Sequence, residues 1–285
     1  MAPDHMSQSK WSIASKAQGL EAQDTASNET VNIIVCGQVG VGKSTLINML
    51  AGQTVAKTSN DVAACTAESS SYTITMPGDR KITLWDTVGL DEGSTGRATV
   101  LAATENIRKL TTRLVESTGL SLILYMVRGK PVGSVITDYL LFKAFCDDKV
   151  PFLLVVTGLD QVSDRAVWWE QNESNFHQES PLSDAHICIV SAKDLHSEAA
   201  CAESVTEVLK LIETTCLRDP WREDRKSWFI KTVSNAAGVL RASTLKASQR
   251  SEILFEGLVR NGVPEDEARA AVRIFKRKYK SAYAK

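Results

Sequence analysis

The sequence predicts a three-layer α/β fold, in which helices cover both faces of a mainly parallel β-sheet, followed by a C-terminal helical extension. Short apolar runs such as "VNIIVC", "LSLILYMV" and "PFLLVVT" alternate with segments of helical spacing. Because these runs are apolar throughout, they are typical of strands that are buried on both faces. Beyond residue 217 no strand candidate remains, which predicts an all-helical end.

The first elements are a strand, a helix and a hairpin. The apolar run at 31–36 predicts a strand, and the segment 44–52 predicts a helix that stops at Gly52. Two β-branched runs, at 71–76 and 81–85, flank the turn "PGDR". We therefore expect these runs to pair as a hairpin.

The remaining strands of the sheet alternate with helices. Strands are predicted at 120–127, 151–157 and 186–191, and helices near 97–117, 134–147, 164–177 and 198–216. Residues 1–29 are polar and without periodicity, so we expect a disordered arm there. The predicted organisation is an arm at 1–29, an α/β domain at 30–217 and a helical extension at 218–285.

The helical extension contains two or three helices. One has its apolar residues between Phe229 and Leu240, and another, near 247–260, carries Leu254 and Leu258. A third begins at Pro264 with acids in its first turn, and its expected apolar face is Ala268, Ala271, Val272 and Phe275.

The end of the chain is basic and aromatic. Residues 269–285 hold seven basic side chains and no acid, with aromatic residues every four positions from Phe275 to Tyr283. The pattern favours an exposed end helix whose aromatic stripe packs on its neighbour. The alternative is a basic amphipathic surface for an anionic membrane or a protein partner.

Charge and cysteine usage exclude some classes of protein. The net charge of −1 gives no global field for nucleic acid, so we expect no nucleic-acid partner. The six cysteines are scattered without a CxxC pair, which favours free thiols in a reducing compartment. No apolar run is long enough to span a bilayer, and we expect a cytoplasmic protein, peripheral to a membrane at most.

The stretch "GQVGVGKSTL" fits the phosphate-loop pattern G-x-x-x-x-G-K-[ST] between the first strand and the first helix. Its glycines allow backbone N–H groups to turn inward around phosphate oxygens, and the helix N-terminus adds partial positive charge. Lys43 is expected to reach the β- and γ-phosphates and Ser44 to offer its hydroxyl to Mg²⁺. The alternative is a glycine-rich turn. The candidate phosphate-binding residues are Gly37, Val39, Gly40, Val41, Gly42, Lys43, Ser44 and Thr45.

A second candidate element for Mg²⁺ lies in "KITLWDTVGL". The strand delivers Asp86 to its carboxyl end, the edge at which open α/β sheets hold their ligands. We expect Asp86 to hold Mg²⁺ through water and the backbone N–H of Gly89 to approach a γ-phosphate. An ordinary Asp-x-x-Gly turn is the alternative.

Two further motifs complete a resemblance. "FLLVVTGLD" ends a strand with Thr157 and Asp160, and "ICIVSAK" ends the next with Ser191, Ala192 and Lys193. With the phosphate loop and Asp86, this order resembles the P-loop GTPases and implies a P-loop NTPase G domain over about residues 31–216. The Thr-x-x-Asp form, "GQVGVGKSTLINMLAG" and "WDTVGL" are similar to the septin-like group, which includes the GIMAP GTPases and the chloroplast outer-envelope import receptors.

The resemblance implies a guanine site. Asp160 would accept hydrogen bonds from guanine N1 and N2, and Ala192 would donate its backbone N–H to guanine O6. One residue departs from the family, because Gly158 stands where a lysine usually lies along the base. We therefore expect weaker binding that still favours GTP over ATP.

The resemblance also implies a switch and a hydrolytic reaction. Thr66, with Thr58 as the alternative, would close over Mg²⁺ and the γ-phosphate. Many GTPases place a glutamine directly after the Asp-x-x-Gly motif, but here the residue is Leu90. We expect slow GTP hydrolysis that increases on homodimerisation across the nucleotide face. The alternatives are a GTP-binding interaction module with negligible hydrolysis and an ATP-using P-loop enzyme.

Overall fold

The computed structural model describes 14 segments of the chain, all within residues 30–280. They are residues 30–56, 70–87, 109–110, 112–114, 117–131, 139, 142–143, 145–146, 148–177, 185–190, 198–224, 227–228, 247–260 and 262–280. The predicted arm at 1–29 and the helix predicted between Phe229 and Leu240 lie outside the described residues.

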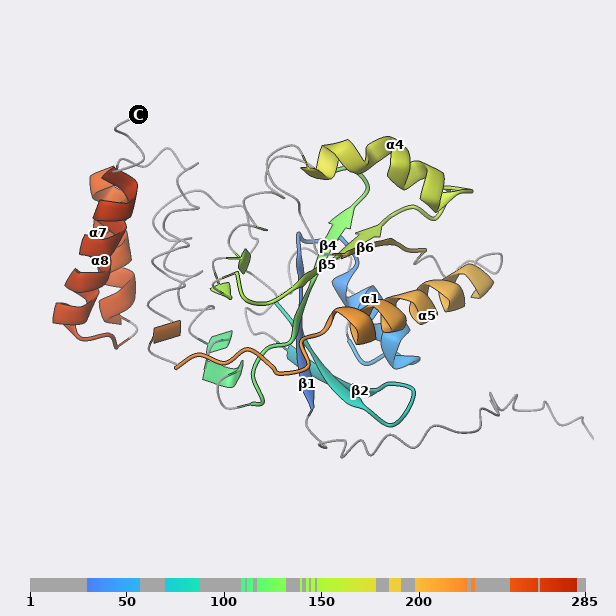
Figure 1. Cartoon of the computed structure of the whole chain (residues 1–285), viewed down its shortest axis with the longest axis horizontal. Coiled ribbons are helices and arrows are strands. Elements are labelled where there is room, and N and C mark those ends of the chain that lie inside the picture. The colour runs from blue at the N-terminus through green and yellow to red at the C-terminus, as the bar shows by residue number, and fades with distance from the viewer. Residues whose placement is uncertain are drawn as a thin grey trace, which may run out of the picture.

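Within the described residues, six strands form one sheet in the order β2-β3-β1-β4-β5-β6. Figure 1 shows this sheet with α1 and α5 beside it. Strand β2 pairs with β3 in antiparallel orientation, and all the other neighbouring pairs are parallel. The mainly parallel sheet and the predicted hairpin are therefore confirmed. The strands are β1 (Val31–Gly37), β2 (Ser70–Thr75), β3 (Lys81–Asp86), β4 (Leu122–Arg128), β5 (Phe152–Thr157) and β6 (Ala185–Cys188).

Three helices of the α/β part, each described over its whole length, begin and end within one residue of their predicted bounds. They are α1 (Lys43–Ala51), α4 (Arg165–His177) and α5 (Glu198–Thr215). The described residues of the helices predicted near 97–117 and 134–147 are mostly helical, and the rest of both segments lies outside the description. Strand β6 ends at Cys188, earlier than predicted, although the Ile189 N–H still donates to the Val156 carbonyl at 2.9 Å.

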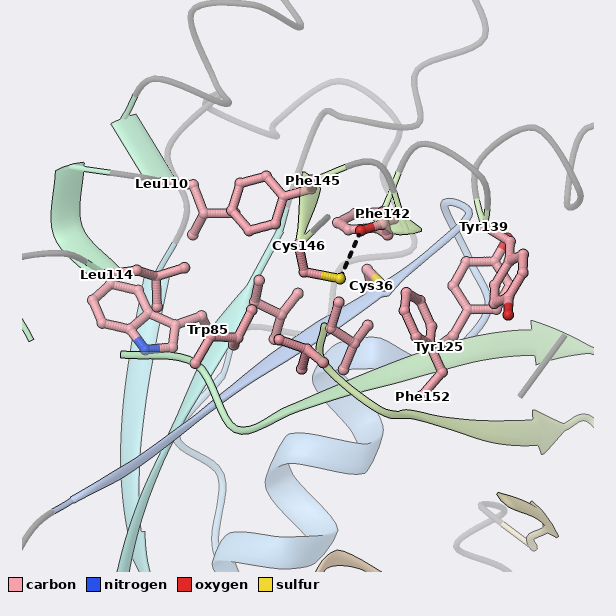
Figure 2. Packing of buried hydrophobic residues seen from close by; sticks show 14 of the residues in the cluster. Cys36, Trp85, Leu110, Leu114, Tyr125, Tyr139, Phe142, Phe145, Cys146 and Phe152 are labelled. Carbon is pink, nitrogen blue, oxygen red and sulfur yellow. Dashed lines mark hydrogen bonds between the residues drawn. The ribbon is translucent and has the colours of Figure 1, made fainter. Parts of the chain in front are cut away.

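Each face of the sheet has its own apolar cluster, because successive side chains of a strand point to opposite faces. In β1, Ile33 and Val35 belong to the cluster that includes α1 and α5, and Ile34 and Cys36 belong to the other. Figure 2 shows the second cluster on the face of the sheet opposite α1. Members of this cluster also come from the segments between β3 and β4 and between β4 and β5. They are Leu110, Leu114, Tyr139, Phe142, Phe145 and Cys146. Burial of each such aliphatic or aromatic side chain stabilises the fold by about 1.5–3 kcal/mol.

Helix α4 is attached to the outer strand β6 by aromatic packing. The ring of Trp169 stacks on His186 of β6 with centroids 3.8 Å apart, and Phe176 lies 4.9 Å from the same indole. Trp169 and Phe176 are buried, so this contact extends the apolar core to the outer strand of the sheet.

The C-terminal helices α7 (Ala247–Arg260) and α8 (Glu265–Lys280) pack against each other (Figure 1). Their predicted apolar residues that the structure describes are buried: Leu254, Leu258, Ala268, Ala271 and Val272. Helix α8 begins at Glu265, one residue after the predicted start at Pro264, and three acids fill its first turn as expected. The position of Phe275 on the apolar face stays a prediction, because the description does not include its side chain.

The extension makes contact with the α/β part through Trp221, whose backbone exchanges two hydrogen bonds of 2.9 Å with Leu120. The domain boundary at 217 stays a prediction.

Among the described cysteines, Cys36, Cys146, Cys188, Cys201 and Cys216 are free thiols. Burial raises the pKa of Cys146 to about 11, so this thiol is protonated near neutral pH. In the described part of the chain, no helix has both the length and the apolar character to cross a bilayer.

Candidate nucleotide-binding site

The phosphate loop connects β1 to α1 through three glycines in the left-handed or an otherwise positive-φ conformation. The φ angles of Gly37, Gly40 and Gly42 are 136°, 79° and 100°. Positive φ is inexpensive only for glycine, and it turns consecutive peptide groups in the way that a phosphate nest requires. Gly42 is the N-cap of α1, and no side chain caps this helix end. The loop therefore presents a helix N-terminus to a ligand.

Lys43 is the first residue of α1, and its side chain folds back over the loop. Its Nζ donates to the carbonyl oxygens of Gly37 and Gln38, the second at 3.0 Å. These bonds hold the ammonium group at the loop that the sequence assigns to phosphate. The amine is thus positioned at the phosphate loop by two carbonyl groups of the loop itself.

Asp86 ends β3 beside this lysine. Strands β1 and β3 are parallel neighbours, and their register pairs Val35 with Asp86, so the carboxylate emerges next to the start of the phosphate loop. Burial raises the pKa of Asp86, while the Lys43 charge and a hydrogen bond from the Ser44 side chain oppose that shift. Three residues that the sequence assigns to phosphate and Mg²⁺ therefore meet at one point.

The donor set at Asp86 fits a hydrated Mg²⁺ ion. The Asp86 carboxylate is 5% exposed, and its Oδ1 atom is buried without a hydrogen-bond partner. An unpaired buried carboxylate oxygen is costly, and it is the kind of atom that a hard cation or its water ligands satisfy. Ser44 supplies a hydroxyl on the same side, so Ser44 and Asp86 would hold the ion.

Thr157 joins the candidate base-binding segment to the phosphate loop. It is the last residue of β5, and its buried hydroxyl donates to the Val41 carbonyl at 2.6 Å. Asp160 lies three residues further on, half-buried in a turn that Leu159 anchors in the core. The structure therefore brings the Thr157–Asp160 segment and the phosphate loop together.

Arg128 is a residue of this site that sequence reasoning missed. It ends β4 in register with Thr157, and its Nη1 lies 3.5 Å from the carbonyl oxygen of Gly40. Its position at the end of a strand that is otherwise buried was the available signal. Only the sheet order shows that β4 lies between β1 and β5.

Several predicted site residues lie outside the described part of the chain. They are Thr58, Thr66, Gly89, Leu90, Ser191, Ala192 and Lys193. Their assigned roles stay predictions. The described residues thus include the phosphate, Asp86 and Thr157–Asp160 elements of the expected site.

Comparison with known proteins identifies the class. Residues 32–157 match the family model described as 50S ribosome-binding GTPase. This match, the mainly parallel sheet and the phosphate loop define a GTP-binding P-loop GTPase domain, in agreement with the predicted G domain.

Curated relatives named GTPase Der match about half of the chain. GTPase Der from Campylobacter curvus (strain 525.92) is 33% identical over 138 residues, which is 48% of this chain and 27% of that protein. GTPase Der from Campylobacter fetus subsp. fetus (strain 82-40) is 32% identical over 154 residues, which is 54% of this chain and 31% of that protein. The chain therefore spans less than a third of the length of these relatives.

A likeness to solved structures supports the fold. Era from Aquifex aeolicus, as a variant bound to GDP and aluminium fluoride, aligns with a TM-score of 0.51 and 19% identity, covering 76% of this chain and 69% of that chain. Era in complex with MgGDPNP and a segment of 16S ribosomal RNA aligns with a TM-score of 0.50 and 17% identity over the same shares.

Proposed function

We propose that this protein is a nucleotide-controlled switch or assembly GTPase that binds GTP and GDP with Mg²⁺ and hydrolyses GTP slowly. The observation that carries the proposal is the meeting of Lys43, Ser44 and Asp86 at the carboxyl edge of the sheet. The hydrogen bond from Thr157 to Val41 also holds the segment that carries Asp160 against the phosphate loop.

The charges at this edge suit hydrolysis of a phosphate anhydride. In the proposed reaction, water attacks the γ-phosphorus in line with the bond to the β,γ-bridging oxygen, and GDP leaves. Lys43 and the N–H groups of the loop offset the negative charge that develops on the phosphate oxygens. When bound, Mg²⁺ adds positive charge there. Thr66 and Gly89 are proposed to complete the site on the γ-phosphate side.

Nucleotide titration tests the first part of the proposal. Calorimetry of the nucleotide-free protein with Mg²⁺ should give tighter binding of GTP and GDP than of ATP. Equal affinity for ATP and GTP would contradict the guanine assignment and favour the ATP-using alternative.

Asp160 is the proposed determinant of guanine selectivity. We expect Asp160→Ala to weaken GDP binding about tenfold to a hundredfold, because a charge-assisted hydrogen bond contributes about 1.5–3 kcal/mol. Inosine diphosphate lacks the 2-amino group, so the wild type should prefer GDP and the variant should bind both alike. Calorimetry with both nucleotides checks this, with Glu170→Ala, an exposed acid of α4, as the matched control. An unchanged preference for GDP in the Asp160 variant would exclude its role.

Turnover separates a switch from a static binding module. Leu90 stands where many GTPases carry a water-orienting glutamine. We therefore expect slow phosphate release, with a specific activity that rises with protein concentration as homodimers form across the nucleotide face. Phosphate release is measured over a hundredfold range of concentration under multiple-turnover conditions. A flat specific activity argues against dimer activation, and no release beyond one turnover favours the interaction module.

The finer assignment and the partners are also proposals. The Thr-x-x-Asp form supports a septin-like placement, whereas the curated relatives are named Der. The expected absence of a nucleic-acid partner is not supported, since the family description names the ribosome and one Era structure contains ribosomal RNA.

The exposed basic residues Arg269, Arg273 and Lys276 on α8 support a contact with an anionic membrane or protein. We also propose that the protein is cytoplasmic and at most peripheral to a membrane. Co-sedimentation with ribosomes and with anionic vesicles discriminates between these partners.

A further inference from the structure

The candidate base-binding segment contains Gly158, which has no side chain that could pack on the face of a base. Gly158 follows Thr157 directly, is exposed and has a φ of 73°. The resemblance to P-loop GTPases implies a lysine here. The structure places another cation at this position.

Arg128 fills the space beside Gly158. Its strand β4 lies next to β5, and the register pairs Arg128 with Thr157, so both chains leave the sheet side by side. The Gly129 N–H also donates to the Thr157 carbonyl at 2.9 Å. A Cβ added to Gly158 would lie 2.8 Å from Cγ and 3.1 Å from Nε of Arg128. The arginine stem therefore occupies the position that a side chain at 158 would need.

The end of the arginine side chain points toward the phosphate loop. From the carboxyl end of β4 it passes Gly158, and Nη1 lies 3.5 Å from the Gly40 carbonyl oxygen. This is a long contact on an exposed side chain, so the guanidinium stays accessible to a ligand. The Arg128 side chain thus lies beside Gly158 and extends to the Gly40 carbonyl of the phosphate loop.

We propose that the guanidinium of Arg128 lies on the face of the purine ring and replaces the lysine that Gly158 lacks. The inference rests on the proposed function, since it names a specificity-determining residue of the same nucleotide site. A planar guanidinium is suited to this role because it stacks on aromatic faces and keeps its charge. Asp160 would read the edge of the base while Arg128 contacts its face.

Two other cations of this edge serve as comparisons. The amine of Lys43 donates to two carbonyls of the phosphate loop and is directed to phosphate. Lys130 is exposed two residues after Arg128, and the three atoms nearest to a Cβ at position 158 all belong to Arg128. Lys130→Ala is therefore a matched control for the loss of a positive charge.

The test is a series of substitutions at one position, with GDP and GTP affinity as the readout. Arg128→Ala and Arg128→Gln should each weaken binding about threefold to thirtyfold, the range of a cation on an aromatic face. Arg128→Lys should stay within about threefold of the wild type, because it keeps the charge. Glutamine keeps a polar side chain but removes the positive charge, so an Arg128→Gln protein that binds GDP and GTP like the wild type would overturn the proposal.

The ring is common to both nucleotides, so the fold loss should be equal for GDP and GTP. A loss that grows with the number of phosphates would assign Arg128 to phosphate instead and overturn the proposal. Arg128 is exposed, so the variants should unfold within about 2 °C of the wild type.

A double-mutant cycle tests the steric relation between the two positions. Gly158→Ala should displace Arg128 and weaken GDP binding in the wild-type background, and should weaken it less in the Arg128→Ala background, where only the strain of its φ of 73° remains. Additive effects contradict the proposal. Unaltered GDP binding in all the Arg128 variants refutes the role of Arg128 alone, whereas a wild type that binds neither GDP nor GTP refutes the proposed function as well.

Discussion

A Gly37→Ala variant is expected to lose at least about a hundredfold in guanine-nucleotide affinity and to unfold roughly 10 °C below the wild type. A Cβ at this position would lie 2.2 Å from the backbone oxygen of Met126 and 3.0 Å from its carbonyl carbon. Both atoms belong to β4, which is buried in the sheet, so β1 and β4 would have to separate at the start of the phosphate loop.

The positive φ of Gly37 adds a second cost to that clash. The φ of 136° lies in a region that L-residues rarely adopt, with a penalty of about 1–3 kcal/mol. Overpacking a dense interior costs about 1–3 kcal/mol more. The affinity falls because the backbone N–H groups of the nest are displaced together.

Gly78 provides the matched control for this substitution. It has a φ of 82° in the β2–β3 turn, and nothing lies within 4 Å of a Cβ placed there. Gly78→Ala should therefore lower stability only through its φ, by about 1 kcal/mol, and leave nucleotide affinity unchanged. Thermal unfolding and calorimetry of both variants make the comparison. A Gly37→Ala protein that behaves like Gly78→Ala would show that the sheet adjusts at Met126.

The second large effect is expected for Asp86→Asn, which should remove the Mg²⁺ dependence of nucleotide binding and raise the stability of the nucleotide-free protein. The wild type should bind GTP at least about tenfold tighter with Mg²⁺ than with EDTA, because the proposed ion or its water ligands would satisfy the buried Oδ1 atom. In the variant this ratio should approach one.

The stability gain follows from the direction of the Asp86 pKa shift. Burial raises the folded-state pKa above 3.8, so the unfolded chain ionises first as the pH rises. Ionisation of Asp86 therefore lowers the stability of the native state through that pH window, and the loss is complete above the folded-state pKa. The neutral amide avoids this loss. We expect the variant to unfold a few degrees higher at pH 7 in EDTA, with a gap that closes toward pH 4.

Asp79→Asn is the control for this experiment, since Asp79 is an exposed carboxylate in the β2–β3 turn. It should leave the Mg²⁺ ratio unchanged. An Asp86→Asn protein that is less stable than the wild type in EDTA at neutral pH would mean that the carboxylate is needed for the fold itself.

Much of the fold was predictable because its signals are local. The apolar runs of β1, β4 and β5 are buried along nearly their whole length, as continuous hydrophobicity predicts for a parallel sheet. The phosphate loop and Asp86 were predictable for a related reason. Both follow directly after such runs, and the carboxyl ends of parallel strands share one edge.

The contacts across strands could not be predicted in the same way. The hydrogen bond from Thr157 to Val41 and the packing of Arg128 on Gly158 join residues that are far apart in the chain. Their proximity depends on the strand order, which places β4 between β1 and β5. The Asn32 side chain is a similar case, because it donates to the Gly119 carbonyl at 2.7 Å and accepts from the Trp85 indole at 2.9 Å.

The buried bond between Thr157 and the Val41 carbonyl has a consequence for nucleotide exchange. It joins the Thr157–Asp160 segment to the phosphate loop through the protein's own atoms, so these two segments are held together for a nucleotide. The entropy of assembling the pocket is then lost during folding, and association should be fast for a site of this kind. Release of a nucleotide should then require the base and the phosphates to leave the two joined segments together. A factor that accelerates exchange would therefore have to act first on the contact between these two residues.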